Sequence, residues 1–345
     1  MSDFLTHEWP LISVVIPVRN EERYISRTIR YLLDQDYPAD KMEIIVVDGR
    51  SDDTTRSRVE EIMAGDSRVR LLDNPRKLSS AGRNIGVMAA GGDIITFIDG
   101  HVYIANNQLI KSAVTLMAEN GVSVLSRPQF LDTPDNNLFQ RAVAAARKSK
   151  LGHGLDSTIF LKEDRSVSPT SSGASYKKEI FGDVGYFDET FDAAEDVDFN
   201  YRVALAGYKS FSSIKLAVYY FPRNNLKGLF MQMARYGTGR YRLFRKHREG
   251  VASGAMMIAL FFIILAGLII GSLFFRPLLP FLGIYGGVYL LAVIISSATV
   301  AMRGEIRQSP FLPVIYLTIH FGLVYGIIKE AIKTIFHRKK RLAAE

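Results

Sequence analysis

Hydrophobic positions follow two different patterns along this chain. Up to about residue 250, short apolar runs alternate with stretches whose apolar residues recur every three or four positions, and charges are scattered throughout. From Val251 to Met302 the only charged residue is Arg276. The pattern predicts a soluble part followed by a membrane region.

The soluble part consists of alternating predicted strands and helices. Short β-branched runs predict strands, and apolar residues at helical spacing predict helices. We expect strands at 11–18, 43–48, 69–72, 94–98 and 122–125. We expect one helix that Asn20 caps and that ends before Pro38, and further helices at 54–64, 79–90, 106–120 and 195–205. This alternation predicts an α/β fold with a mostly parallel sheet.

Three apolar runs make up most of the remaining chain. Each of the runs 252–275, 277–302 and 309–328 reaches the roughly 20 residues that a helix needs to cross a bilayer core. We expect the first two to cross. The expected organisation is a soluble domain at 1–224, a basic amphipathic interface segment at 225–250, a membrane region at 251–328 and a basic tail at 329–345. The stretch 133–170 is expected to be an excursion around a site.

Basic residues indicate which side of the membrane the soluble part occupies. Six Lys and Arg side chains lie between 235 and 248, just before the first run, and positive charge beside a membrane segment favours the cytoplasmic side. The first ten residues lack the pattern of a signal peptide. We therefore expect a multi-pass protein of the inner (plasma) membrane whose soluble domain is cytoplasmic. If the third run spans, however, the basic tail ends outside, so this run is re-entrant or interfacial, or the rule fails here.

Composition narrows the chemistry. The net charge is +8, and there is no cysteine, which excludes disulfides, thiolate metal sites and thiol nucleophiles. The basic residues cluster beside apolar runs, which favours contact with anionic membrane lipids over nucleic acid, whose sites pair basic grooves with stacking aromatic rings. The sequence indicates no oligomeric state.

Polar clusters follow three of the predicted strands. They lie at 17–21, 48–53 and 99–101, and the carboxyl ends of parallel strands share one edge of a sheet, where ligands bind. Each cluster alone is explained by a helix cap or a turn. No glycine-rich dinucleotide fingerprint follows the first strand, which argues against the usual dinucleotide site. Together the clusters predict a binding site at this edge.

Two further groups carry candidate chemistry. Asp99 and His101 could hold a divalent cation, Mg²⁺ or Mn²⁺, beside a diphosphate. Glu195, Asp196 and Asp198 put three carboxylates into one turn, more than capping requires, so one could act as a general base.

These segments resemble a known family. SVVIPVRNEE, VVDGRSDDT, SAGRNIGVMAAGGDIITFIDGH and GDVGYFDETFDAAEDVDFNYR occur in the order and spacing of the family 2 glycosyltransferases, over roughly residues 11–220. The resemblance implies a Rossmann-like GT-A fold and an inverting, metal-dependent transfer of a hexose from a nucleotide diphosphate donor, with UDP the expected nucleotide. The membrane tail resembles bacterial members that assemble exopolysaccharide or lipid-linked oligosaccharide, which implies a lipid-linked or saccharide acceptor.

The resemblance also implies roles for individual residues. Asp196 matches the catalytic base, and Asp99 and His101 match the metal motif. The residues implied in nucleotide-sugar binding are Pro17, Asn20, Glu21, Asp48, Asp53, Arg83, Asn84 and Asp99. Those implied at the acceptor or diphosphate are Glu195, Gln232, Arg235 and Tyr236.

The chain departs from the family pattern at three positions. His101 replaces the second Asp of the Asp-x-Asp motif, Gly49 replaces an Asp, and Tyr236 replaces a Trp. His101 leaves the identity and the affinity of the metal undetermined, and Tyr236 leaves undetermined whether synthesis is processive. The alternatives are a processive polysaccharide synthase, a polyprenyl-phosphate sugar transferase and a non-enzymatic nucleotide-sugar-binding scaffold.

Overall fold

The computed structural model describes residues 9–153, 159–160, 162–171, 173–247 and 253–342. The sequence predictions for residues 1–8, 248–252 and 343–345 lie outside them. Contacts divide the described chain into two compact units. The first comprises residues up to 133 and from 159 to 221, and the second comprises 134–153 and the residues from 222 onward.

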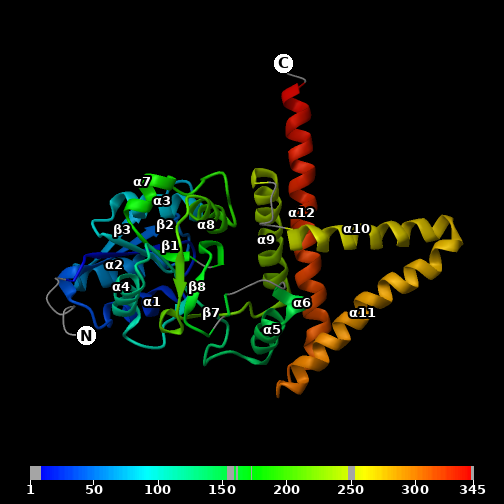
Figure 1. Ribbon diagram of the computed structural model, residues 1–345, viewed down its shortest axis with the longest axis horizontal. Coiled ribbons are helices and arrows are strands. Elements are labelled where there is room, and N and C mark those ends of the chain that lie inside the picture. The colour runs from blue at the N-terminus through cyan, green and yellow to red at the C-terminus, as the bar shows by residue number, and fades with distance from the viewer. Residues whose placement is uncertain (1–8, 154–158, 161, 172, 248–252, 343–345) are drawn as a thin grey trace. The chain divides into compact units, whose positions relative to one another are not determined.

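The first unit is built on a mostly parallel sheet (Figure 1). Its strands, in spatial order, are β3 (Val69–Asp73), β2 (Met42–Asp48), β1 (Ile12–Val18), β4 (Ile94–Phe97), β9 (Gly173–Lys177), β6 (Val124–Ser126), β10 (Ser210–Ser212) and β8 (Arg165–Val167). The first four strands in this order run parallel, whereas β9 and β8 run antiparallel to their neighbours. A small sheet, with the order β5 (Val102–Tyr103), β11 (Val218–Tyr220) and β7 (Gln129–Phe130), completes the unit.

Helices cover both faces of the large sheet. They are α1 (Ile25–Leu33), α2 (Thr55–Gly65), α3 (Ser79–Ala89), α4 (Leu109–Asn120), α7 (Glu179–Val184) and α8 (Glu195–Leu205), with short 3₁₀ turns η2 (Ala39–Lys41), η3 (Pro169–Ser171) and η4 (Ile214–Leu216). Successive side chains of β1 point to opposite faces, so Val14 packs in one core and Val15 in the other. The unbroken apolar run that predicted β1 reflects this burial on both faces.

The expected cap of the first helix is wrong. Helix α1 begins at Ile25, and its N-cap position, Tyr24, makes no side-chain capping bond. Asn20 lies before the helix, with a left-handed φ of 59°, and its Oδ1 accepts a hydrogen bond from the Asp52 backbone N–H at 3.1 Å. Asn tolerates this conformation better than most residues. Asn20 therefore joins two loops at the sheet edge instead of capping a helix.

The second unit is helical. Its elements are α5 (Leu138–Lys148), α6 (Lys150–His153), α9 (Leu226–His247), α10 (Ser253–Phe274), η5 (Arg276–Leu278), α11 (Leu279–Met302), η6 (Ser309–Phe311) and α12 (Leu312–Leu342). In Figure 1, α9 lies beside α12, α10 crosses α12 steeply, and α11 returns obliquely toward it.

The segment that carries α5 packs with these helices. Asn137 and Gln140 form a capping box that starts α5. Ala142 and Ala146 then join Met233 of α9 and Tyr316 of α12 in one core cluster. Alanines on one face of α5 leave room for close approach of the larger side chains. The sequence analysis had predicted only an excursion around a site for this stretch.

Among the residues that the structure describes, three helical stretches are long and apolar enough to cross a membrane. They are Gly254–Phe274, Arg276–Met302 and Ser309–Phe336. Within their most apolar windows, 17%, 6% and 50% of residues are buried by protein. The third stretch therefore differs from the other two, since half of it is covered by neighbouring helices.

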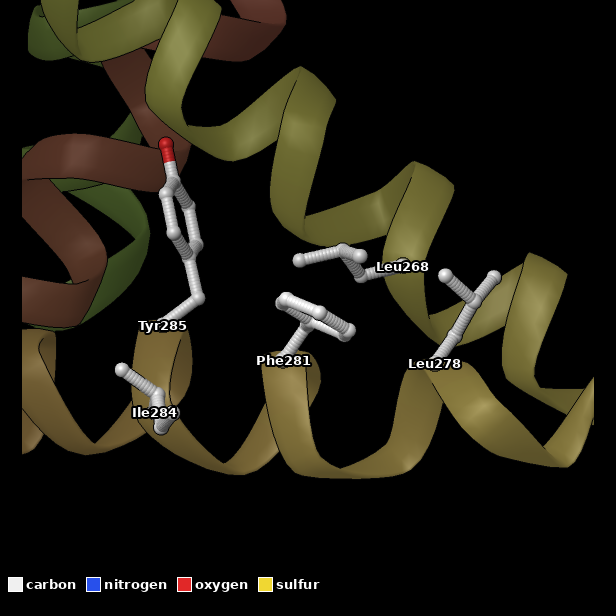
Figure 2. Close-up of a pocket in the computed structure, with 5 residues that line it drawn as sticks. All are labelled: Leu268, Leu278, Phe281, Ile284 and Tyr285. Atoms are coloured by element: carbon white, nitrogen blue, oxygen red, sulfur yellow. The ribbon is translucent and has the colours of Figure 1, made fainter.

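A small apolar pocket lies between α10 and α11 (Figure 2). Leu268 lines it from α10, Leu278 from η5, and Phe281, Ile284 and Tyr285 from α11. No charged side chain lines it. Such a lining suits hydrocarbon and offers nothing to a diphosphate.

Glycines allow α9 and α12 to pack closely. A Cβ on Gly326 would collide with the carbonyl oxygen of Ala234, and one on Gly237 would collide with that of Leu323. Gly322 and Gly326 form the small-xxx-small spacing that lets helix backbones approach each other. The close contact between the two helices therefore requires glycine at these positions.

We expect Gly326→Leu to separate α9 from α12 and to destabilise the protein by about 2 kcal/mol, as other insertions into packed interiors do. Thermal unfolding of the detergent-purified protein measures the change. Gly267→Leu in α10 is the matched control, because no atom lies within 4 Å of an added Cβ there. Equal Tm values for the two variants would contradict the close-packing interpretation.

Candidate active site

The loops that follow β1 and β2 are joined by hydrogen bonds. The backbone N–H of Asn20 donates to Ser51 Oγ at 2.9 Å, and that of Glu21 donates to Thr55 Oγ1 at 2.7 Å. Pro17 lies beside Gly82 of α3, where an added Cβ would come within 3.1 Å of the Pro17 ring. The edge at which the three polar clusters were predicted to meet is thus a continuous structure, as the parallel order of β2, β1 and β4 requires.

Asp48 and Asp53 lie at the β2 side of this edge. Asp48 is only 1% exposed, and it accepts hydrogen bonds from the hydroxyl and the backbone N–H of Ser51 at 2.6 and 3.2 Å. Asp53 accepts from the backbone N–H groups of Thr55 and Glu22 at 2.9 and 3.2 Å. Both carboxylates therefore shape the loops, and a contact with a base stays a prediction.

Asp99, Gly100 and His101 follow β4 and meet the β1 loop. His101 Nδ1 lies 2.8 Å from Glu21 Oε1, and an added Cβ on Gly100 would come within 2.9 Å of Val18 Cγ1. A glycine is required at this close approach. The structure therefore brings Glu21, Asp99 and His101 together, as predicted from their positions after neighbouring strands.

Arg83 of α3 links two acidic positions. Its Nη2 lies 3.6 Å from Asp99 Oδ1, and its Nε lies 3.4 Å from Glu195 Oε1. The guanidinium carbon also lies 5.0 Å from the centre of the Phe97 ring. Because Asp99 follows β4 and Glu195 opens α8, this one side chain connects the sheet edge to the start of α8.

Burial and charge shift the acidities of this cluster. Burial alone raises the pKa of Asp99, but the charges of Arg83 and His101, the hydrogen bond from Tyr220 and the charge of Arg127 outweigh it, so the pKa lies below its usual value. Burial also raises the pKa of Glu195; the nearby Asp196 charge adds to this and Arg83 opposes it. Asp99 is therefore held as a carboxylate, whereas Glu195 has a greater tendency to bind a proton.

Asn84, the neighbour of Arg83, acts through the backbone. Its amide oxygen accepts from the Phe187 N–H at 2.9 Å, and its nitrogen donates to the Phe187 carbonyl and to Glu189 Oε1, each at 2.9 Å. These bonds attach α3 to the segment that leads to α8. Asn84 thus positions that segment, and its role in the donor pocket stays a prediction.

Asp196 lies in the first turn of α8. It is half-buried, and its Oδ1 accepts from the backbone N–H of Val197 at 2.9 Å. The helix begins after Ala194, a non-glycine residue with a left-handed φ of 64°. Such a conformation is uncommon for a residue with a side chain and occurs often at functional sites. Asp198, by contrast, is fully buried and paired with Arg202 at 3.1 Å, so its role is structural.

Gln232, Arg235 and Tyr236 belong to the second unit. They lie on α9, where Arg235 is exposed and Tyr236 is 42% exposed. The Tyr236 ring packs against Arg147, whose guanidinium carbon lies 5.6 Å from the ring centre. Their roles at an acceptor or diphosphate stay predictions.

Two residues of the site were missed from the sequence. Tyr220 of β11 donates a hydrogen bond to Asp99 Oδ2 at 2.8 Å. Arg127, at the end of β6, is 5% exposed and donates from Nη2 to the Phe97 carbonyl at 2.7 Å. Its Nε and Nη1 are buried without a hydrogen-bond partner among the described residues. A basic residue directly after a predicted strand could have indicated Arg127; nothing in the VYYF sequence marks Tyr220.

The unpaired groups of Arg127 indicate a role in binding an anion. A buried guanidinium with too few partners costs stability, and methionine of similar volume removes that cost. We expect Arg127→Met to leave the Tm unchanged or higher and to raise KM for a substrate about tenfold, the usual effect of losing a hydrogen bond to a charged group. Thermal unfolding and steady-state kinetics on the same preparation measure both. A lower Tm with unchanged kinetics would make Arg127 purely structural.

A divalent cation fits the donor set at Asp99. Among the described residues, no group of three or more His, Asp and Glu side chains is arranged to hold a metal. Mg²⁺ and Mn²⁺ sites that serve a diphosphate commonly use one or two carboxylates and complete their shell with phosphate oxygens and water. The Asp99 carboxylate, kept ionised, would supply such a ligand.

Comparisons with known proteins identify the fold and the family. The family model described as "Glycosyl transferase family 2" matches residues 13–185. The succinoglycan biosynthesis protein ExoA of Rhizobium meliloti (strain 1021) is 34% identical over 252 residues, which cover 72% of this chain and 73% of that protein.

A relative from Methanococcus voltae is 23% identical over 333 residues, which cover 93% of this chain and 97% of that protein. Its name is dolichyl N-acetyl-α-D-glucosaminyl phosphate 3-β-D-2,3-diacetamido-2,3-dideoxy-β-D-glucuronosyltransferase. The solved mannosyltransferase PcManGT of Pyrobaculum calidifontis, in complex with GDP-Man and Mn²⁺, is 19% identical, with a TM-score of 0.60 over 95% of this chain and 91% of that one. The GT-A fold predicted from the sequence is thereby confirmed, and this chain belongs to glycosyl transferase family 2.

Proposed function

We propose that this glycosyltransferase moves a hexose from a uridine diphosphate donor to a hydroxyl of a lipid-linked saccharide, with inversion, at the cytoplasmic face of the inner membrane. The observation that carries the proposal is the position of Arg83. It joins Asp99, at the carboxyl edge of the sheet, to Glu195, the neighbour of Asp196, in a domain of a family that acts on nucleotide sugars.

The donor is proposed to lie along the edge formed by β2, β1 and β4. Pro17, Asn20, Glu21, Asp48 and Asp53 contribute to its nucleotide end, where the loops after β1 and β2 are joined by hydrogen bonds. Arg83 and Arg127 supply positive charge near the diphosphate, and a guanidinium is suited to phosphate oxygens by its planar set of donors.

Asp99 is proposed to bind the divalent cation, with His101 beside it. A bound cation would neutralise charge on the departing diphosphate. The structural neighbour from Pyrobaculum calidifontis is in complex with GDP-Man and Mn²⁺, which supports a divalent metal in this fold. Glu21 Oε1, 2.8 Å from His101 Nδ1, holds the imidazole in place beside Asp99.

Asp196 is proposed to be the general base. It is half-buried at the N-terminal turn of α8, one residue from the carboxylate that Arg83 holds. A carboxylate there can take the proton of an acceptor hydroxyl as the hydroxyl attacks the anomeric carbon. One displacement inverts the configuration, so an α-linked donor gives a β-linked product. Much of the remaining rate acceleration comes from holding donor and acceptor in position.

The acceptor is proposed to be carried by a lipid. Two helical stretches, Gly254–Phe274 and Arg276–Met302, are long and apolar and little covered by protein, which fits membrane insertion. The relative from Methanococcus voltae is named for a dolichyl-linked sugar phosphate. A bilayer would hold such an acceptor beside the enzyme, and Gln232, Arg235 and Tyr236 are the proposed contacts to its polar end.

Release of nucleoside diphosphate from a panel of UDP-, GDP- and dTDP-sugars tests the proposal. The purified protein is assayed with Mg²⁺, Mn²⁺ or EDTA, with and without polyprenyl-diphosphate sugars, and Asp99→Ala serves as the control. We expect metal-dependent, acceptor-stimulated release from one UDP-sugar that the variant has lost. Binding without turnover would favour a nucleotide-sugar-binding scaffold, and a ladder of long products would favour a processive synthase.

A further inference from the structure

Helices α9 and α12 run side by side in the same direction (Figure 1). Gly322 packs against Phe230 and Met233, and Gly326 packs against Ala234 and Thr238. Further along, Arg242 Nε lies 2.8 Å from Glu330 Oε1. The numbers of the contacting residues rise together along both helices. The two helices are therefore parallel, and their basic C-terminal ends lie at the same end of the pair.

This pairing places the apolar part of α12 beside charged positions of α9. If α12 crossed the bilayer through its apolar run 309–328, the adjacent part of α9 would enter the hydrocarbon with it. That part carries Lys227, Gln232 and Arg235, whereas Arg242 lies beside Glu330, beyond the run. A charged side chain inside a bilayer is rare and costly, and this part of α9 carries two. Because α12 is packed against α9, it cannot enter the bilayer more deeply than the charged side chains of α9 allow.

The first half of α12 is attached to the α5–α6 segment. Tyr316 donates a hydrogen bond to Ser149 Oγ at 2.9 Å, and His320 Nε2 lies 2.9 Å from the Leu151 carbonyl. Both ends of this segment connect to the glycosyltransferase domain, so the segment itself does not cross the membrane. Both halves of α12 thus contact elements that belong on the domain's side of a membrane.

The hairpin of α10 and α11 meets α12 at two separate places. Phe262 of α10 packs on Val324 and Ile327, and Val293 and Val300 of α11 pack in the cluster that holds the first turns of α12. Figure 1 shows the turn of the hairpin far from α12, and α10 crossing it steeply. Hence α12 lies across the base of the hairpin and does not follow its direction.

One apolar stripe of α12 is about half exposed, although Phe321 contacts Phe262 and Tyr325 contacts Phe230 at its edges. Its members are Val314, Phe321, Tyr325, Ile328, Ile332 and Ile335, each between 38% and 54% exposed. They recur at intervals of three, four or seven residues, so they share one face along the helix. The stripe continues past the first charged residue, Lys329, which is typical of a helix that lies in a membrane surface.

We propose that α12 lies in the plane of the membrane, with its apolar stripe against the acyl chains of the leaflet that faces the glycosyltransferase domain. Of the described helices, only α10 and α11 then cross the bilayer. The basic tail stays on the domain's side, which removes the conflict between a third span and the distribution of positive charge. The inference rests on the proposed membrane location, but not on any substrate.

The absence of cysteine permits a direct test. Arg58→Cys in α2, Arg276→Cys in the hairpin turn and Lys329→Cys in α12 each introduce one exposed thiol. A membrane-impermeant maleimide is applied to sealed bacterial vesicles of each orientation. We expect Lys329→Cys to be labelled from the same side as Arg58→Cys, and Arg276→Cys from the opposite side. Labelling of Lys329→Cys together with Arg276→Cys would overturn the proposal.

Spin labels along the stripe provide a second readout. Nitroxides attached at Val314→Cys, Tyr325→Cys and Ile335→Cys are expected to show the same depth in liposomes, by their relative accessibility to oxygen and to a polar nickel complex. A steady change of depth along α12 would mean that it spans. Labelling of all three maleimide positions from one side would overturn the hairpin itself, and with it the membrane location. Neither measurement depends on enzyme activity. A wrong substrate assignment would therefore leave both results unchanged, whereas a wrong position of α12 would change them.

Discussion

Asp196→Asn is expected to lower kcat for sugar transfer by about 10²- to 10⁴-fold, the usual contribution of a general base. The donor dissociation constant should change little, because asparagine keeps the oxygen that accepts from the Val197 N–H. Single-turnover transfer measures the first quantity, and calorimetric titration of the donor measures the second.

Asp192→Asn is the matched control for this variant. Asp192 is an exposed carboxylate in the loop before α8, so the substitution removes the same charge outside the cluster around Arg83. We expect near-normal transfer by the control. Full transfer by Asp196→Asn would disprove its assignment as the base and shift attention to Glu195, whose raised pKa suits proton transfer.

Arg83→Met is expected to cost about 3 kcal/mol of folding stability or more, because removing one partner of a buried ion pair leaves the other charge uncompensated. The Arg83 side chain is 13% exposed and forms ion pairs with both Asp99 and Glu195. Donor binding should fall as well, since Asp99 would lose the charge that keeps it ionised. Denaturant unfolding and donor titration check both effects.

The pH dependence of the Arg83→Met deficit shows whether charge is the cause. The lowered pKa of Asp99 means that it stabilises the fold above its unfolded pKa, and that this is lost as the pH falls through its folded pKa. The raised pKa of Glu195 acts in the opposite sense, with stability present below its unfolded pKa and lost as the pH rises through its folded one.

Without Arg83 both pKa values rise, so the deficit should be largest near neutral pH, where both groups are charged. It should shrink toward the ordinary carboxyl range near pH ~4. Arg83→Lys, which keeps the charge, should recover part of the stability. A deficit that is the same at every pH would instead mean that Arg83 acts by packing on Phe97 and Phe187.

Much of the first unit could be predicted from its sequence, because each element carries its own local pattern. The strand at Ile12–Val18 is apolar at nearly every position because both of its faces are buried. The order of strands then brings Glu21 and His101, far apart in the chain, to within 2.8 Å. The meeting of Asp99 with Arg83 follows from the same topology.

The remaining features depend on contacts that no local pattern encodes. Asn20 does not cap the helix that follows it, because its amide oxygen accepts a hydrogen bond from the backbone N–H of Asp52, which is distant in sequence. Tyr220 reaches Asp99 from a small sheet formed by segments distant in sequence. The association of α5 with α12 likewise rests on alanines, which give little signal in a polar stretch.

The configuration of the product tests the proposed mechanism most directly. With the donor identified, the enzyme would transfer a sugar from its α-linked nucleotide to a saccharide acceptor, and proton NMR would report the anomeric configuration of the new bond before any equilibration. A β-linked product from the wild-type protein, and none from Asp196→Asn, is the predicted result, because a single displacement assisted by Asp196 inverts the anomeric carbon. An α-linked product would contradict the single displacement and the role of Asp196 within it.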